Sequence, residues 1–268
     1  MAQEEATSFD FSNLLSMRGQ GVVVLGAGQG IGEQSCLALA NVGAQVLCVD
    51  SSEEHANRIA ERTGGEAFVG DVTSRESIVQ IFERADSLFG KKFHGVVDVV
   101  GVASLKPIAD FSDNDWYRQF DIVVKHAFMT VQVAGAMLAR NGGGSMTFIG
   151  SLSGLTSVPN QAIYGSSKAA LHHFVRCAAH EYGPKNVRIN AISPGFTRTP
   201  RLEKILPADG WRQVEESIPL RRAATVGDIA SGVLYLQSPL SRYVTANVLV
   251  LDGGSTTAAA IPNVVPKI

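Results

Sequence analysis

Cysteine is scarce in this chain of 268 residues, which contains three copies. Cys36, Cys48 and Cys177 show no metal-ligand spacing, and an odd number of thiols cannot all form disulfides. The six histidines, including the adjacent His172 and His173, have no carboxylate or cysteine at metal spacing. The sequence therefore excludes a disulfide scaffold and predicts no metal site. It favours reduced thiols and ordinary packing or surface roles for the histidines.

An excess of charge of one sign and long hydrophobic runs are also missing. The formal net charge of −2 gives no reason to expect a nucleic acid partner. No uninterrupted run of about 18 apolar residues occurs, so we expect no transmembrane helix and no membrane partner. The opening stretch MAQEEATSFDFSNLL lacks the basic leader and apolar core of a signal peptide. Together these absences favour a cytoplasmic location.

Hydrophobic residues, by contrast, make up 45% of the chain, so a substantial core can form. Short apolar segments alternate with helical ones, the pattern of a parallel sheet covered on both faces. Thr73 with Glu76, and Ser112 with Asp115, have the spacing of capping boxes at helix starts. We predict a doubly wound α/β fold with seven mostly parallel strands, at 21–27, 44–50, 66–71, 94–101, 144–150, 187–193 and 247–253.

No internal repeat or flexible linker divides the chain. We therefore expect a single domain over residues 1–268, with an amino-terminal extension at 1–17 and a carboxy-terminal tail at 255–268.

A glycine-rich stretch, GAGQGIG at residues 26–32, connects the first predicted strand to the first predicted helix. Glycines at these positions allow a sharp turn, a close approach of the backbone to a pyrophosphate, and tight packing of helix on strand. The free N–H groups of the helix start would then face the phosphates. The context favours a Rossmann-type dinucleotide site over the alternative of a merely tight turn.

Asp50 ends the second predicted strand, about twenty residues after the glycines, where a carboxylate accepts hydrogen bonds from ribose hydroxyls. Its charge would repel a 2′-phosphate, and Gln29 inside the turn cannot pair with one. Both residues favour NAD over NADP as the cofactor. Asp71 ends the third strand and has two open interpretations, a contact to the adenine edge or a polar cap on the next turn.

The stretch QAIYGSSKAALHHF places Tyr164 and Lys168 four residues apart in a predicted helix. Residues at this spacing share one helix face. The pair is open to two interpretations: ordinary surface residues, or a phenol and an ammonium that act together as an acid/base pair.

Seven stretches, in this order and spacing, resemble the short-chain dehydrogenase/reductase family over residues 18–255. They are GAGQGIG, VDSS, GDVTS, IGSLSG, YGSSK, NAISPGFTRTP and VTANVLVLDGG. The resemblance implies an NAD(H)-dependent oxidoreductase that interconverts a secondary alcohol and a ketone. It implies the catalytic residues Ser151, Tyr164 and Lys168. The cofactor-binding residues it implies, together with the two motifs above, are Gly26, Gln29, Gly30, Ile31, Gly32, Asp50, Ser51, Asp71, Val72, Gly101, Tyr164, Lys168, Pro194, Gly195, Thr197 and Thr199.

The expected roles follow from the chemistry of the three side chains. Tyr164 removes the hydroxyl proton, Ser151 orients the substrate oxygen, and Lys168 holds a positive charge near the phenol and binds the nicotinamide ribose. A tyrosine pKa near 10 would have to fall to about 7, which takes about 4 kcal/mol of stabilisation of the phenolate. We expect Lys168 and the oxidised nicotinamide to provide it.

The region 196–218 resembles the variable substrate loop of the family. Its apolar residues favour a hydrophobic or alicyclic substrate, such as a steroid-like alcohol, although core packing explains several of them equally well. The residues expected in this pocket are Leu152, Leu155, Phe196, Leu202, Ile205 and Trp211.

Three positions depart from the family pattern. Leu25 replaces a threonine, Asp98-Val99-Val100-Gly101 replaces Asn-Asn-Ala-Gly, and Val123 replaces an asparagine linked by water to the lysine. We interpret Leu25 and Val99 as one exchange of hydrogen bonds for apolar packing between neighbouring strands. Val123 cannot anchor a water, and helix geometry turns Lys125 and His126 away from its direction.

The resemblance leaves other functions to be weighed. Enoyl reductases of the family have a longer Tyr-to-Lys spacing, and epimerases have a larger carboxy-terminal region. The departures instead raise a second hypothesis, a non-catalytic NAD-binding regulatory or partner protein. The resemblance also implies a homo-oligomer, a tetramer or dimer, in which the helix at 162–182 pairs with its twofold mate.

Overall fold

A parallel sheet of seven strands forms the centre of the protein in a computed structural model that describes residues 13–257. The strand order β3-β2-β1-β4-β5-β6-β9 confirms the predicted doubly wound fold. All seven predicted strands are present, with ends that differ by a few residues. Their bounds are β1 Gly21–Leu25, β2 Gln45–Asp50, β3 Glu66–Val69, β4 Phe93–Asp98, β5 Gly144–Ile149, β6 Val187–Pro194 and β9 Val248–Leu251. Most of the predicted amino-terminal extension and carboxy-terminal tail, 1–12 and 258–268, lies outside the described residues.

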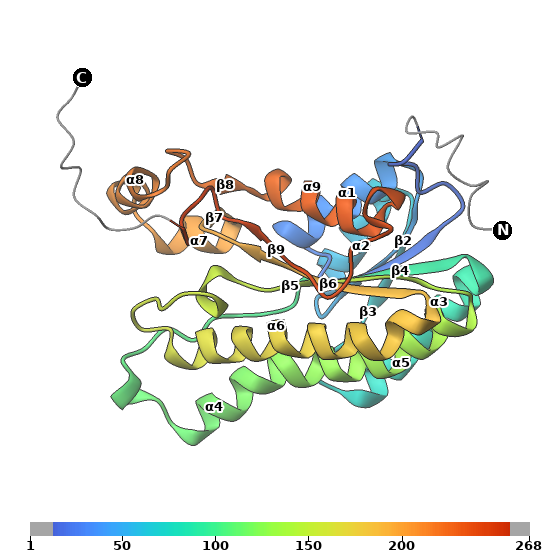
Figure 1. Ribbon diagram of the computed structural model, residues 1–268, viewed down its shortest axis with the longest axis horizontal. Coiled ribbons are helices and arrows are strands. Elements are labelled where there is room, and N and C mark those ends of the chain that lie inside the picture. The colour runs from blue at the N-terminus through green and yellow to red at the C-terminus, as the bar shows by residue number, and fades with distance from the viewer. Residues whose placement is uncertain (1–12, 258–268) are drawn as a thin grey trace.

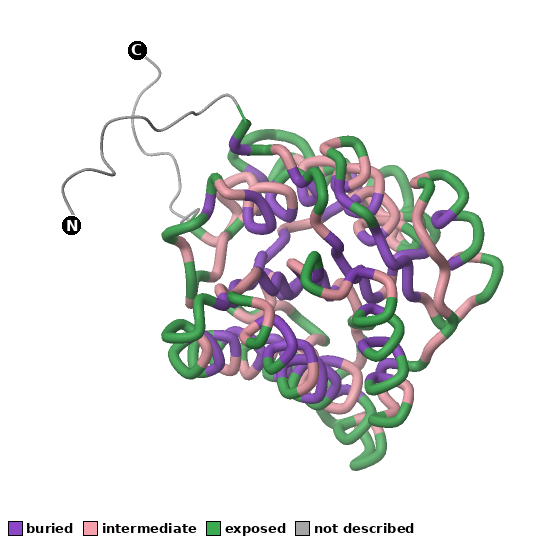
Figure 2. The backbone as a smooth tube through the Cα atoms, turned by 90° about the vertical axis from the view of Figure 1, so that its right-hand side faces the viewer, coloured by how far each residue is buried: buried purple, intermediate pink, exposed green. Residues whose placement is uncertain are grey.

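Helices cover both faces of this sheet (Figure 1). On one face lie α1 (Ile31–Asn41), α2 (Glu53–Thr63) and α9 (Val226–Gln237), with a core that includes Val24, Leu39 and Val233. The opposite face holds α3 (Arg75–Phe89), α5 (His126–Arg140) and α6 (Ala162–Tyr182). Figure 2 shows the buried central strands between helices whose outer sides are exposed. Because both faces are covered, apolar residues predominate in the central strands.

The helix starts test the two predicted capping boxes. Ser112 and Asp115 form the expected box at the start of α4 (Asp113–Phe120). The prediction for Thr73 is wrong, because Ser74 caps α3 by accepting a hydrogen bond from the Ser77 N–H at 3.3 Å. Thr73 instead donates both its N–H and its hydroxyl to Asp71. The chain enters the helix one residue later than the spacing suggests because Asp71 organises the preceding turn.

A π-helical turn, Asp121–Lys125, joins α4 to α5 in one helical segment, Asp113–Arg140. By length and hydropathy this segment would be long and apolar enough to cross a membrane. More than half of its apolar window is buried inside the protein, however, against α3, α6 and the sheet. Core helices commonly have this composition, so the segment is weak evidence for a membrane span.

The predicted substrate region folds as a small unit beyond β6. A short strand, β7 (Thr197–Arg198), pairs in parallel with β8 (Ala224–Thr225). Between them lie α7 (Pro200–Ile205) and α8 (Ala208–Ser217). This pairing fixes both ends of the region beside the carboxyl edge of the sheet.

Candidate active site

Two adjoining cavities lie at the carboxyl ends of the central strands. The first, the glycine-turn cavity, measures about 370 Å³ and is lined by residues following β1, β2, β3 and β4. The second, the tyrosine cavity, measures about 250 Å³ and contains Ser151, Tyr164 and Lys168. Ile31, Val99, Gly101, Thr199 and Arg201 line both, so the two spaces share one wall. Every residue predicted for the site lines one of the two cavities, with Gly32 as the exception.

Gly32 lines neither cavity and is needed for close packing of the helix on the strand. A Cβ atom at this position would lie 1.9 Å from the Gly26 carbonyl oxygen, so helix α1 could not approach strand β1 as closely. The predicted contact of Gly32 with the cofactor stays a prediction. The same glycine meets the third requirement of the motif, close packing of helix on strand.

The remaining glycine turn has the shape of a phosphate cradle. Gly26 and Gly30 have φ angles of 78° and 60°, which side chains rarely adopt. No side chain caps the first turn of α1, where backbone N–H groups have no partner within the helix. A Cβ on Gly30 would project toward Thr199 and Pro200, across the cavity. The residues present thus fit a dinucleotide whose pyrophosphate lies at this helix start.

Asp50 at the end of β2 orders this turn and also lines its cavity. One carboxylate oxygen accepts a hydrogen bond from the Gly28 N–H at 2.9 Å, and the other accepts from the Ser52 N–H at 3.0 Å. Its side chain is 14% exposed, and His55 lies 3.8 Å from it. These bonds hold the carboxylate at the cavity wall.

Asp71 forms the predicted polar cap, and its contact to the adenine edge stays a prediction. It accepts the two hydrogen bonds from Thr73 that cap the following turn, and it lines the glycine-turn cavity together with the largely buried Val72. The cap leaves one carboxylate oxygen available to the cavity.

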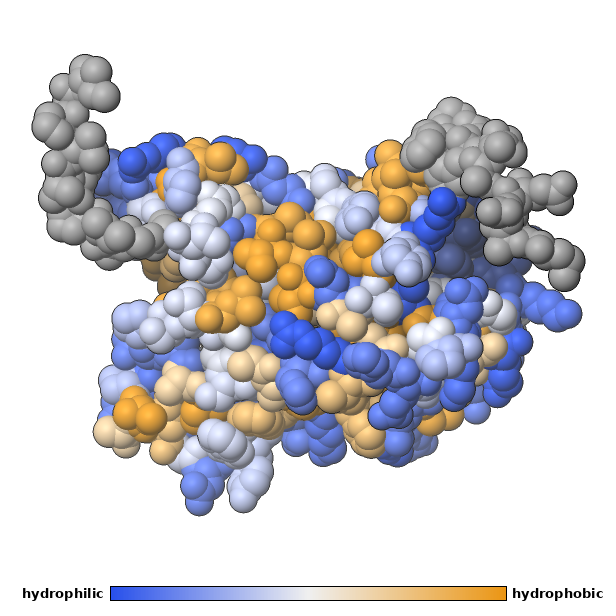
Figure 3. Space-filling model, in the orientation of Figure 1, coloured by the Kyte–Doolittle hydropathy of each residue, from blue (hydrophilic) through white to orange (hydrophobic). Residues whose placement is uncertain are grey.

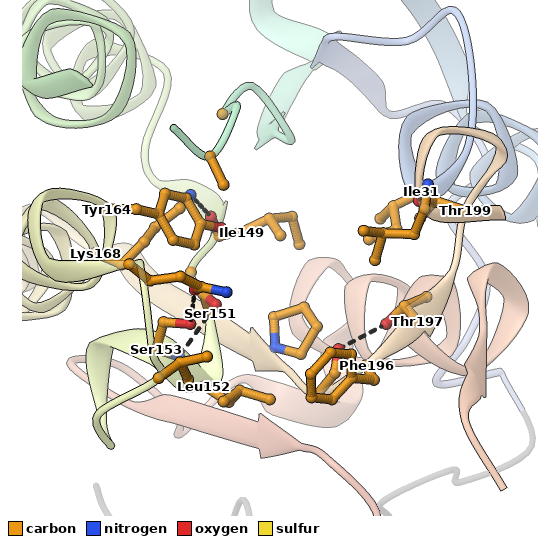
Figure 4. Close-up of a pocket in the computed structure, with 18 of the residues that line it drawn as sticks. Ile31, Ile149, Ser151, Leu152, Ser153, Tyr164, Lys168, Phe196, Thr197 and Thr199 are labelled. Carbon is orange, nitrogen blue, oxygen red and sulfur yellow. Dashed lines mark hydrogen bonds between the residues drawn. The ribbon is translucent and has the colours of Figure 1, made fainter. Parts of the chain in front are cut away.

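Lys168 is almost completely buried in the tyrosine cavity, with 2% of its surface exposed. Its Nζ donates a hydrogen bond to the Ile149 carbonyl at 2.7 Å and lies 5.8 Å from the centre of the Tyr164 ring. Figure 4 shows both side chains on one side of the cavity, opposite Ile31 and Thr199. Burial lowers the pKa of Lys168 to about 8, against the opposing effect of the Asp98 charge. The helix thus presents the pair toward the cavity rather than to the outer surface.

Burial raises the pKa of the Tyr164 phenol above its ordinary value, while hydrogen bonding to Ser151 and the charge of Arg201 act in the opposite direction. The lowering predicted from the sequence is therefore not present in the protein alone. Burial is the largest of these influences on the phenol, because it disfavours the charged phenolate. Ser151 also accepts a hydrogen bond from the Ser153 N–H at 3.2 Å, which orients its side chain.

One departure from the family pattern, Asp98, has a partner that sequence reasoning missed. Asp98, at the end of β4, lies 2.9 Å from Nε2 of His126 on α5, and both side chains are buried. Asp98 also accepts a hydrogen bond from the Val100 N–H at 3.1 Å. His126 therefore compensates for the aspartate of the altered segment and not for Val123. The signal available in the sequence was the presence of two polar residues, Asp98 and His126, in otherwise apolar segments.

Leu25 and Val99 do not form the single exchange that we expected. Leu25 lies opposite Asp98 in the register of β1 and β4 and belongs to the core beneath α5. Val99 directly follows Asp98, and successive side chains along an extended chain point to opposite faces of the sheet. Val99 therefore packs against the core on the other face. Val123 is fully buried in the first of these cores, within the π-helical turn.

Three of the six residues expected in the substrate pocket do line it: Leu152, Phe196 and Leu202. The other three do not. Leu155 and Ile205 are exposed outside the tyrosine cavity, and Trp211 is buried beneath the guanidinium of Arg198 at 4.4 Å. Val158, Ala103 and Leu105 line the cavity instead.

Thr197 and Thr199 place hydroxyls on the far wall of the tyrosine cavity (Figure 4). Thr197 donates to the Gly195 carbonyl at 3.0 Å, whereas Thr199 caps α7 by accepting from the Leu202 N–H at 3.3 Å. The Thr199 hydroxyl therefore retains its proton for donation to a ligand.

The six histidines and the three cysteines all lie within the described residues. Within residues 13–257 there is no cluster of histidine, cysteine, aspartate or glutamate that could hold a metal ion. His172 is buried, and burial with the nearby Lys168 charge lowers its pKa to about 4. All three cysteines are free, with Cys36 and Cys48 buried and Cys177 exposed.

A glycine turn and a buried tyrosine–lysine pair that meet at one edge of a doubly wound sheet define a Rossmann-fold oxidoreductase. Residues 26–256 match a family model described as enoyl-(acyl carrier protein) reductase. The chain belongs to the short-chain dehydrogenase/reductase family.

Curated and solved relatives cover nearly the whole chain. The 7alpha-hydroxysteroid dehydrogenase of Escherichia coli (strain K12) is 32% identical over 248 residues, which are 91% of this chain and 96% of that protein. The 3-oxoacyl-(acyl-carrier-protein) reductase of Thermotoga maritima is 29% identical over 245 residues, 90% of this chain and 99% of that protein. A solved 7 alpha-hydroxysteroid dehydrogenase complexed with NADH and 7-oxo glycochenodeoxycholic acid is similar in structure, with a TM-score of 0.87. It is 31% identical in sequence, with 92% of this chain and 98% of that chain covered.

Proposed function

We propose that this protein is an NAD(H)-dependent oxidoreductase that interconverts a secondary alcohol and a ketone on a hydrophobic or alicyclic substrate. The observation that carries the proposal is the shared wall of the two cavities. A dinucleotide in the glycine-turn cavity would extend past Gly101 and Thr199 to reach Tyr164 and Lys168. When bound, the nicotinamide accepts or supplies the hydride.

The protein's own residues would handle the proton and the substrate oxygen. Tyr164 removes the hydroxyl proton during oxidation and returns it during reduction. Ser151 hydrogen-bonds the same oxygen and fixes its distance from the phenol. Lys168 supplies positive charge behind the phenol, held in place by the Ile149 carbonyl. The apolar lining excludes water and selects hydrophobic substrates.

A panel of alicyclic and steroid ketones and secondary alcohols tests the proposal, with NADH or NAD⁺ and with the corresponding NADP forms. We expect absorbance changes at the reduced-nicotinamide band with at least several hydrophobic members. Binding of NADH without turnover of any member would instead favour the non-catalytic NAD-binding alternative. The E. coli and T. maritima relatives support redox chemistry but leave the nucleotide to be measured.

The preference for NAD over NADP is predicted to depend on Asp50. Loss of its charge in Asp50→Ala should lower the NAD-to-NADP ratio of kcat/KM by about 10- to 100-fold, since a hydrogen bond to a charged group contributes about 1.5–3 kcal/mol. Steady-state kinetics with both nucleotides measures this ratio. Asp50→Asn removes the negative charge but retains an oxygen that can accept the hydrogen bond from the Gly28 N–H. This variant therefore distinguishes the effect of the charge from the effect of a disturbed turn.

Asp71→Asn is the matched control, because Asp71 is a second carboxylate in the same cavity. It should change the ratio much less than Asp50→Asn. Equal use of NAD and NADP by the unaltered protein would contradict the assignment of NAD.

We also propose a cytoplasmic homo-oligomer, a dimer or tetramer. Strand β9 is at the edge of the sheet, and Figure 3 shows hydrophobic residues gathered over this region of the surface. Val250 of β9 is 39% exposed in the single chain, as expected for a residue that a second subunit covers.

A further inference from the structure

Arg201, near the start of α7, lines both cavities and no predicted role accounts for it. One of its guanidinium nitrogens lies 3.5 Å from the Ala103 carbonyl, across the mouth between α7 and the loop after β4. A guanidinium has five N–H donors, so most of them stay available to a ligand. Arg201 therefore places a positive charge at the junction of the two cavities.

The charged side chains that line the tyrosine cavity are positive. Among the residues that line it within the described chain, Lys168 and Arg201 carry charge, and both are cations. Lys168 has the Asp98 carboxylate as a nearby counter-charge. Arg201 forms no ion pair with a carboxylate in residues 13–257, since each ion pair found there joins other residues. The cavity thus holds one cation that is left without an anion.

Arg198, three residues earlier, differs from Arg201 because carboxylates pair with its charge. Its guanidinium pairs with Glu203 at 2.8 Å and with Glu215 at 2.9 Å, and it stacks on Trp211. Those acidic partners fix Arg198 as a structural residue. Arg201, on the adjacent helix, faces the cavity and has no such partners.

We propose that Arg201 binds an anionic group of the substrate, so that the substrate is an apolar ketone or alcohol that carries a carboxylate. The inference rests on the proposed function, because it names the substrate class of the same site. The apolar body would contact Leu152, Phe196 and Leu202, the reacting oxygen would meet Ser151 and Tyr164, and the carboxylate would reach Arg201 at the cavity mouth. Guanidinium binds carboxylate in two parallel hydrogen bonds, which also orients the ketone.

The test compares an oxocyclohexanecarboxylate with its uncharged methyl ester, using NADH as the reductant. In the unaltered protein the acid should be reduced with the higher kcat/KM. Arg201→Gln should lower the ratio of kcat/KM for the acid to kcat/KM for the ester by about 10- to 100-fold. Arg201→Lys should lower this ratio by less, because lysine keeps the positive charge but cannot form the two parallel hydrogen bonds of a guanidinium. Lys204→Gln on the same helix, outside both cavities, is the matched control and should leave the ratio unchanged. Added salt should weaken the preference for the acid.

Calorimetric titration of the acid into the protein–NADH complex gives a second readout that does not need turnover. Binding of the acid that weakens about 10-fold or more in Arg201→Gln supports the inference. Equal losses for acid and ester, together with weaker NADH binding, would show that the guanidinium serves the nucleotide phosphates and would overturn it. Turnover of neutral ketones with no preference for acids would overturn the inference and leave the proposed function intact. A complete lack of turnover would contradict the proposed function, while the titration still decides the anion site.

Discussion

Replacement of Tyr164 by phenylalanine is expected to lower kcat for alcohol oxidation by about 10²- to 10⁴-fold, the usual contribution of a positioned general acid or base. The phenol is the titratable group that meets Ser151 in the tyrosine cavity, and phenylalanine keeps the ring while it removes the proton carrier. NADH affinity should change little, because the hydroxyl adds little to the wall of the glycine-turn cavity. Stopped-flow or steady-state kinetics and fluorescence titration of NADH measure the two quantities.

Tyr182→Phe is a matched control at the far end of the same helix, where the ring packs near Gly135. It should leave kcat nearly unchanged. A Tyr164→Phe protein with kcat close to that of the unaltered protein would show that another group moves the proton, and the mechanism proposed above would be wrong.

The second large effect concerns stability and the buried pair of Asp98 and His126. We expect His126→Leu to lower the free energy of unfolding by about 3–5 kcal/mol, because it leaves a carboxylate buried without its partner. The double variant Asp98→Asn with His126→Leu should be less destabilised than the sum of the single changes, since the isolated charge is then gone. Urea unfolding at one fixed protein concentration measures each value.

A second histidine–aspartate pair provides the control. His55 lies 3.8 Å from Asp50 and its side chain is 34% exposed, so His55→Leu should cost less than about 1 kcal/mol. Similar small losses in the two histidine variants, or strict additivity in the double variant, would contradict the role given to the buried pair.

The elements and residues that the sequence predicted correctly share a local origin. A strand that runs into GAGQGIG and then into a helix specifies its own turn, and the spacing of Tyr164 and Lys168 specifies a common helix face. The apolar strands likewise follow from burial on both faces of a parallel sheet. These signals need only neighbouring residues, so they can be read without knowledge of the fold.

Sequence reasoning fell short where distant segments meet. Gly32 is in the expected turn, but its proximity to the Gly26 carbonyl depends on how α1 packs on β1. Leu155, Ile205 and Trp211 are apolar residues of the expected region, yet the orientation of α7 and α8 removes them from the cavity. The pKa of Tyr164 depends on its burial, which no spacing reveals.

By itself, the sequence determined the doubly wound fold, the glycine turn and the shared helix face of Tyr164 and Lys168, because each is encoded in a short stretch with its own periodicity or turn chemistry. Only the tertiary structure decided that Asp98 pairs with His126, that Val123 belongs to the core, and that Arg201 faces the tyrosine cavity without an acidic partner. Those relations depend on the register of β4 against β1 and on the packing of helices from distant parts of the chain. Electrostatic compensation between such segments leaves no periodic signal in one sequence.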